Sequence, residues 1–149
     1  MRYGQAYMVN ELKNEFWVHY RGHKIGDICK DATFVSTKML PFNLIWDASQ
    51  AIFLKSAFLQ VSKEYTNYRY RGDWIFWIDI DLLGDVVISG KLISYFLKHG
   101  NDVTSKAITE GYSFLEEIKA MDYFSINEKI AFDQNQFLCP ICSVFNFKK

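Results

Sequence analysis

The sequence contains no apolar run close to the roughly 20 residues that a helix needs to cross a bilayer. Its first sixteen residues lack the basic-then-apolar order of a signal peptide. Net charge is absent too, because 17 basic residues balance 17 acidic ones. Without a positive field the chain is a poor candidate for binding nucleic acid or an anionic membrane surface. We therefore predict neither a membrane span nor a nucleic-acid partner.

Cysteine is scarce, with Cys29 near the start and Cys139 and Cys142 close to the end. A lone Cys-x-x-Cys pair is half of a zinc site, and neither His23 nor His99 stands at a spacing that completes one. We predict no metal site, and a small zinc-containing domain built on this pair is a less favoured alternative. The cysteines are then either unpaired and buried or, in an exported protein, joined as a disulfide from Cys29 to Cys139 or Cys142.

A Gly-x-Gly-x-x-Gly motif after a strand is also missing, which argues against a Rossmann-type dinucleotide site. Aromatic residues are abundant instead, with 13 Phe, 9 Tyr and 4 Trp to fill a core or line a cleft for a flat ligand. The length of 149 residues suits one domain. We take residues 1–149 as that domain and residues 137–149 as a cysteine-containing tail.

The pattern along the chain predicts a mixture of strands and helices, which makes α+β the economical fold class. Aromatic and β-branched residues predict strands, with turn residues between them, at residues 12–20, 32–37, 74–81, 114–119 and 129–132. Apolar residues three to four apart predict the main helix over residues 44–65, with Asn43 as its N-cap and Asp47 in its first turn. A short helix is expected over residues 91–98, and residues 103–112 are expected to be irregular or weakly helical.

Two segments resemble the catalytic domain of mono-ADP-ribosyltransferases of the cholera and pertussis toxin type. The first is His19-Tyr20-Arg21-Gly22 with Gly26, followed by Phe34-Val35-Ser36-Thr37, where that family has a histidine strand and then an aromatic-Val-Ser-Thr strand. The second is the aromatic run of residues 74–81, similar to the family's Tyr-x-Tyr-x-Ile strand. The likeness spans about residues 7–130. It implies mixed sheets around a central NAD cleft, with few helices.

The resemblance places the catalytic glutamate on an acidic strand after that run. Glu117 fits with a one-residue slip, and Glu116 is the alternative. Alternation along a strand would turn the two toward opposite faces. Cleavage of the nicotinamide–ribose bond develops positive charge on the ribose, which a carboxylate can stabilise. Ser36 would orient that glutamate and the ribose, because a hydroxyl both donates and accepts.

Further family positions imply how NAD would be held. His19 would contact the ribose or the phosphates, and Thr37 would lie beside Ser36 at the NAD site or support its strand. The family's phosphate-bracing arginine corresponds only loosely to Arg2, because the aspartate of its Tyr-Arg-x-Asp motif is missing here. Arg21 is the alternative.

The implied function is a toxin, secreted or delivered to a target cell, that transfers ADP-ribose from NAD to a protein of a host or competitor cell and releases nicotinamide. NAD glycohydrolase activity and delivery subunits would accompany it. A second glutamate two positions before the catalytic one, typical of enzymes that modify arginine, is absent, so a non-arginine acceptor is allowed. The alternative is a catalytically impaired binding or regulatory protein of the same fold.

Overall fold

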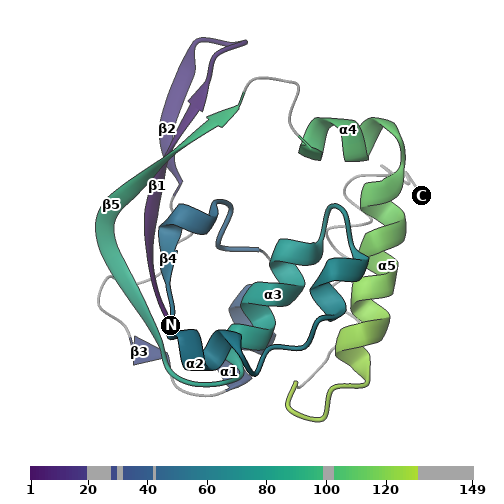
Figure 1. Ribbon diagram of the computed structural model, residues 1–149. Coiled ribbons are helices and arrows are strands. Elements are labelled where there is room, and N and C mark those ends of the chain that lie inside the picture. Colours follow the sequence, from purple (N-terminus) through teal and green to yellow (C-terminus); the bar gives the residue numbers. More distant parts are fainter. Residues whose placement is uncertain (20–27, 30–31, 42, 99–102, 131–149) are drawn as a thin grey trace, which may run out of the picture.

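The computed structural model describes residues 1–19, 28–29, 32–41, 43–98 and 103–130. It combines a mixed β-sheet with helices, which confirms the α+β class in general terms. Figure 1 shows the sheet along one side of the molecule and helix α5 (Tyr112–Ser125) along the other, with helix α3 (Gly72–Asp81) between them. Residues 137–149, expected to be a tail, lie outside the described residues.

Strand β1 (Arg2–Asn10) lies inside the sheet and pairs with three other strands. β2 (Glu15–His19) forms an antiparallel hairpin with its second half, which confirms the strand predicted within residues 12–20. β5 (Val86–Lys98) runs parallel to β1, and the short β3 (Ile28–Cys29) and β4 (Ala51–Ile52) pair antiparallel with the beginnings of β5 and β1. Because parallel strands need a crossover, the chain between β1 and β5 passes through the helical part of the molecule.

The pairing of β1 with β5 contains an irregularity next to Gly4, where the register shifts on either side of Gln5. A Cβ atom added to Gly4 would lie 2.8 Å from the carbonyl oxygen of Lys91 and 2.8 Å from Ile93 Cδ1. That distance is too short for any side chain, so glycine lets the two strands approach each other here.

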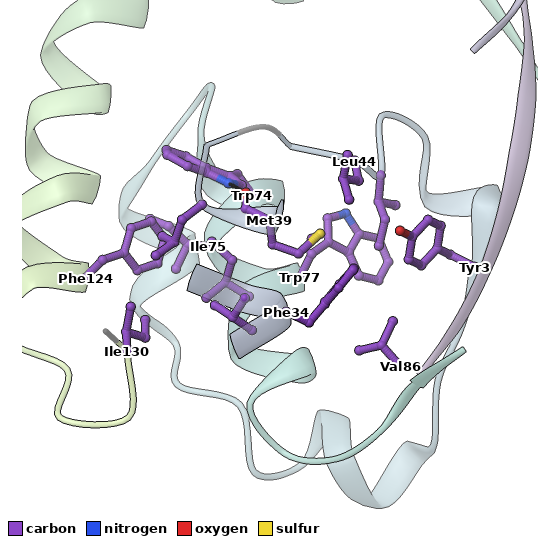
Figure 2. Packing of buried hydrophobic residues seen from close by; sticks show 14 of the residues in the cluster. Tyr3, Phe34, Met39, Leu44, Trp74, Ile75, Trp77, Val86, Phe124 and Ile130 are labelled. Carbon is purple, nitrogen blue, oxygen red and sulfur yellow. Dashed lines mark hydrogen bonds between the residues drawn. The ribbon is translucent and has the colours of Figure 1, made fainter. Parts of the chain in front are cut away.

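The hydrophobic core fills the space between the sheet and α5, with α3 at its centre (Figure 2). Trp74 of α3 packs edge-on against Phe124 of α5, with ring centroids 5.2 Å apart, and its indole nitrogen donates to the carbonyl oxygen of Met39 at 2.7 Å. Trp77 lies on the side of α3 that is nearer to Tyr3 of β1. Because the buried indole N–H of Trp74 has an acceptor, its burial leaves no unsatisfied donor, and Trp74 stabilises the packing of α3.

The strand predicted over residues 74–81 is wrong, because this segment forms most of α3. A short apolar run does not reveal by its pattern whether it is a buried strand or a buried helix. Here almost every residue of the helix is buried, so neither a 2-residue nor a 3.6-residue period stands out.

The strands predicted over residues 32–37 and 114–119 are also helical. The first segment forms α1 (Ala32–Phe34) and the beginning of the π-helical turn η1 (Val35–Met39), and the second lies inside α5. The β-branched and aromatic residues of segment 32–37 favour a strand locally. Packing of Phe34 and Val35 into the core, together with Met39 at the end of η1, outweighs that preference.

The long helix predicted over residues 44–65 is replaced by short elements: the 3₁₀ turns η2 (Ala48–Gln50) and η3 (Glu64–Asn67), the helix α2 (Lys55–Phe58) and β4. Asn43 caps no helix and accepts instead from the backbone nitrogen of Ile45 at 3.2 Å. Asp47 is the N-cap of η2, where Gln50 completes a capping box. The buried Gln50 also donates to the carbonyl oxygen of Gly4, which ties this segment to β1.

Three smaller predictions have mixed outcomes. Residues 91–98 continue β5 and are not a helix, whereas α4 (Val103–Thr109) confirms the weak helix expected within residues 103–112. Residues 129–130 are a turn and a bend in place of the expected strand, and residues 131–132 lie outside the described residues. None of the helices formed by the described residues has the length and hydrophobicity that a membrane crossing requires.

Candidate functional site

Ser36, expected to organise bound NAD from a strand, lies inside η1. Its hydroxyl donates to the carbonyl oxygen of Ala32 at 3.0 Å, and the side chain is buried. Thr37 makes the same type of bond to the carbonyl oxygen of Thr33 at 2.7 Å. Such bonds to the preceding turn are the usual contacts of serine and threonine in helices. The expectation that Ser36 and Thr37 stand on a strand is therefore wrong.

Glu116 lies on α5, and its carboxylate accepts three backbone N–H bonds from a segment 45 to 47 positions earlier. The donors are the nitrogens of Arg69, Tyr70 and Arg71, at 2.8, 2.7 and 2.9 Å. Burial alone would raise the pKa of Glu116, but these donors, with Lys119, hold it below its ordinary value. Glu116 therefore stays ionised and fixes the position of the 69–71 segment.

Glu117 contacts the same segment through a side chain. Its carboxylate forms an ion pair with the guanidinium of Arg71 at 2.5 Å, and both side chains are about one-fifth exposed. Glu116 and Glu117 do not point to opposite faces of a strand, because successive residues of a helix are only about 100° apart. Both glutamates that were considered for catalysis thus hold the 69–71 segment.

The other predicted NAD contacts lie on the sheet or outside the described residues. Arg2 is exposed at the beginning of β1, and His19 ends β2 opposite Ala6. Arg21 lies outside the described residues, as does the side chain of His19. Figure 1 shows α5, which carries both glutamates, on the far side of α3 from β1. Arg2 and the glutamates therefore belong to opposite sides of the molecule.

An open cavity of about 800 Å³ lies next to the 69–71 segment. We call it the aromatic cleft. It is bounded by η3 and the chain that follows it, the end of β5 and the beginning of α4, and its lining residues are Trp46, Tyr65, Thr66, Tyr68, Arg69, Tyr70, Gly72, Asp73, Phe96, Leu97, Val103 and Thr104. Its five aromatic side chains are half-buried, so each exposes part of a ring to a ligand.

A smaller cavity of about 100 Å³ adjoins the aromatic cleft and shares Arg69, Tyr70 and Val103 with it. Lys106 and Glu110 also line this second cavity, together with Tyr112. The guanidinium of Arg69 lies 6.0 Å from the centre of the Tyr112 ring and forms no ion pair with any described residue. Two exposed cations therefore line this pair of cavities, Arg69 in both and Lys106 in the smaller one.

This site was missed at the level of sequence, although its signal is visible there. Residues 65–71 read Tyr-Thr-Asn-Tyr-Arg-Tyr-Arg, an interleaving of aromatic and basic residues. Residues 67–73 are mostly polar and contain a glycine, a composition typical of a loop. The local sequence gives no sign of Glu116, which lies 45 to 47 positions further along the chain. Its three hydrogen bonds hold this segment in place as one wall of a cavity.

Metal binding and disulfide pairing are only partly covered by the structure. Across the described parts of the chain, no group of three or more His, Cys, Asp or Glu side chains is arranged to hold a metal ion. Cys29 is half-buried in β3, but Cys139 and Cys142 lie outside the described residues, so the predicted pairing stays a prediction.

Comparison of the chain with protein-family models, with curated proteins and with solved structures found no match.

Proposed function

We propose that this protein binds a nucleotide in the aromatic cleft, with NAD as the first compound to test. The observation that carries the proposal is the combination of stacking surface and positive charge at one place. Tyr65, Tyr68 and Phe96 offer ring faces or edges. Arg69 lines both the cleft and its smaller neighbour, and Lys106 lines the neighbour. The volume of about 800 Å³ is in the range of cavities that hold ligands of nucleotide size.

The chemistry of a nucleotide matches each part of this lining. A base stacked on an aromatic side chain gains about 1–3 kcal/mol, and this gain depends little on which base it is. A guanidinium can bind phosphate oxygens in a bidentate way, and Arg69 forms no ion pair within the described part of the chain. The Asp73 carboxylate on the same wall is an acceptor for ribose hydroxyls. The choice of NAD among nucleotides rests on the resemblance of the sequence to ADP-ribosyltransferases.

Glu116 supports the proposal as a positioning residue. Its carboxylate is occupied by three backbone donors, so it is unsuited to contact a ligand directly. By fixing the backbone of residues 69–71 it holds Arg69 and Tyr70 at the wall of the cleft. Pre-organised contacts of this kind lower the ordering cost of binding.

Calorimetric titration with NAD tests the proposal, with two arginine variants as a matched pair. Arg69→Met should weaken binding at least tenfold, whereas Arg2→Met, which removes an exposed arginine of β1, should leave it unchanged. The opposite result would favour the arrangement implied by the resemblance. Titrations with AMP and with nicotinamide mononucleotide would show which half of NAD the cleft holds. Absence of binding for all three compounds would exclude the proposal.

ADP-ribosyl transfer is a second candidate, and the position of Glu117 favours it. Glu117 pairs with Arg71, the immediate neighbour of the cleft residues Tyr70 and Gly72. A carboxylate there would stabilise the positive ribose that forms when the nicotinamide–ribose bond breaks, after which water or a protein nucleophile bonds to the ribose carbon. Ser36 has no part in this version, since its hydroxyl bonds within its own helical segment.

Release of nicotinamide from NAD measures this second candidate. The wild-type chain should release it slowly, Glu117→Gln should not, and Asp122→Asn, an exposed change on the same helix, should behave like the wild type. Binding of NAD without release would support the catalytically impaired alternative. The protein acceptor, the delivery into a target cell and the secreted location stay predictions of the resemblance.

A further inference from the structure

A third cavity, of about 370 Å³, lies at the C-terminal end of α3 and shares no described residue with the aromatic cleft. Its lining residues are Ala32, Asp81, Leu82, Gly84, Asp85 and Lys129. Three of these residues, Ala32, Leu82 and Gly84, are small or apolar. The other three, Asp81, Asp85 and Lys129, carry ionisable side chains. None of the predicted NAD contacts that the structure describes lines it.

Asp81 is the unusual member of this lining. Its side chain is only 3% exposed, and neither carboxylate oxygen has a hydrogen-bond partner among the described residues. The other buried carboxylates of the described chain are satisfied, Glu116 by three backbone donors and Asp79 by the hydroxyl of Tyr123. A buried carboxylate without donors is expensive unless it is neutralised or paired with a cation.

The charges around Asp81 do not supply such a pair. The ammonium group of Met1 donates to the carbonyl oxygen of Asp85 at 2.6 Å, and Lys129 forms no ion pair with any described carboxylate. Burial raises the pKa of Asp81 well above its ordinary value, and the charge of the Met1 ammonium offsets this only in part. Both oxygens are shielded from solvent, so a cation that entered the cavity would reach this acceptor once the Asp81 side chain turns toward it.

We propose that this cavity binds a small organic cation of the alkylguanidinium or alkylammonium type, with Asp81 as its counter-ion. A guanidinium presents paired N–H donors that match a carboxylate in a bidentate way. The cavity is far larger than a bare metal ion requires, and the described residues contain no set of three metal ligands. Asp85 is exposed beside it and adds negative charge at its mouth.

Gly84 allows the cavity to be blocked without touching the carboxylate. A Cβ atom added to Gly84 would meet nothing within 4 Å, and its backbone is not in the left-handed region that only glycine favours. Gly84→Leu should therefore fold normally while its side chain takes up part of the cavity. Asp81→Asn removes the charge and keeps the shape, so the two variants test space and charge separately.

NMR titration of the full chain with methylguanidinium chloride tests the proposal, with methylurea as the neutral compound of the same shape. Methylguanidinium should bind at least ten times more tightly than methylurea and should shift the signals of Asp81, Leu82 and Gly84. Methylammonium chloride should bind at the same place. Asp81→Asn and Gly84→Leu should each weaken binding at least tenfold, Asp85→Asn should weaken it by less than threefold, and titration with NAD should be the same in all four proteins.

Three results would overturn the proposal. Equal binding of methylurea and methylguanidinium, or unchanged binding by Asp81→Asn, would show that the carboxylate does not select the ligand. Binding that appears only after Lys129→Met would show that Lys129 already serves as the counter-ion. Because NAD binding is measured at a different cavity, failure here leaves the proposed function untouched, and failure there leaves this site untouched.

Discussion

The two ends of the helical part of the molecule bury a carboxylate in opposite ways. On α5, Glu116 accepts three backbone N–H bonds, and its pKa lies below the ordinary glutamate value. At the end of α3, Asp81 is buried without a donor among the described residues, and its pKa lies well above the ordinary aspartate value. The same functional group is thus a structural anchor in one region and an unmatched charge in the other.

Removing the charge of Glu116 should have the largest effect. Glu116→Gln keeps the size of the side chain but turns an amide N–H toward backbone donors, which should cost about 2–3 kcal/mol of unfolding free energy. Urea unfolding at neutral pH measures the loss. Asp122→Asn on the same helix is the control and should change the stability by less than about 0.5 kcal/mol. Equal effects of the two variants would contradict the role of Glu116.

The unfolding free energy lost in Glu116→Gln should decrease as the pH falls. Because the pKa of Glu116 is lower in the folded state, its stabilisation is complete above the ordinary glutamate pKa and disappears as the pH falls through the folded-state value. The difference between the wild type and Glu116→Gln should therefore shrink in acid. A difference that stayed constant from neutral pH into acid would show that the lost contacts do not depend on charge.

Removing the charge of Asp81 should have the opposite sign. Asp81→Asn should raise the unfolding free energy at neutral pH by about 1 kcal/mol, because it removes an ionised group from a buried site without donors. The pKa of Asp81 is raised in the folded state, so the gain should be absent below the ordinary aspartate pKa and grow as the pH rises toward the folded-state value. Urea unfolding across this range measures it. The exposed Asp85→Asn is the control, and a destabilised Asp81→Asn would contradict the comparison.

Asp79 provides an intermediate case, with an effect no larger than that at Asp81. It is buried on α3 and accepts from the hydroxyl of Tyr123, with oxygen–oxygen distances of 3.0 and 3.2 Å. Tyr123→Phe should cost about 1 kcal/mol, because it deletes this donor but leaves the carboxylate in place. Tyr112→Phe, an exposed tyrosine of the same helix, should change the stability by less than half of that. Thermal unfolding of the two variants in parallel would show whether the Tyr123 hydroxyl stabilises the fold through Asp79.

The sequence allowed the general fold class and strand β2 to be predicted, but not strand β1, and little of the site. Residues 15–19 contain the aromatic and β-branched residues that favour a strand, and they form β2. Residues 74–81 could not be assigned in this way, because a segment buried on all sides has no periodicity. The partners of Glu116 lie more than 40 positions away, so only the packing of α5 against the 69–71 segment reveals its role.

The central claim is that a nucleotide binds against the segment that Glu116 holds in place. Photolabelling with an 8-azidoadenine analogue of NAD, followed by peptide mapping, tests this claim most directly. We predict that the label appears on peptides within residues 64–71, that excess NAD prevents it and that Arg69→Met loses it. Labelling concentrated on residues 32–37 around Ser36, or labelling that NAD does not prevent, would contradict the account.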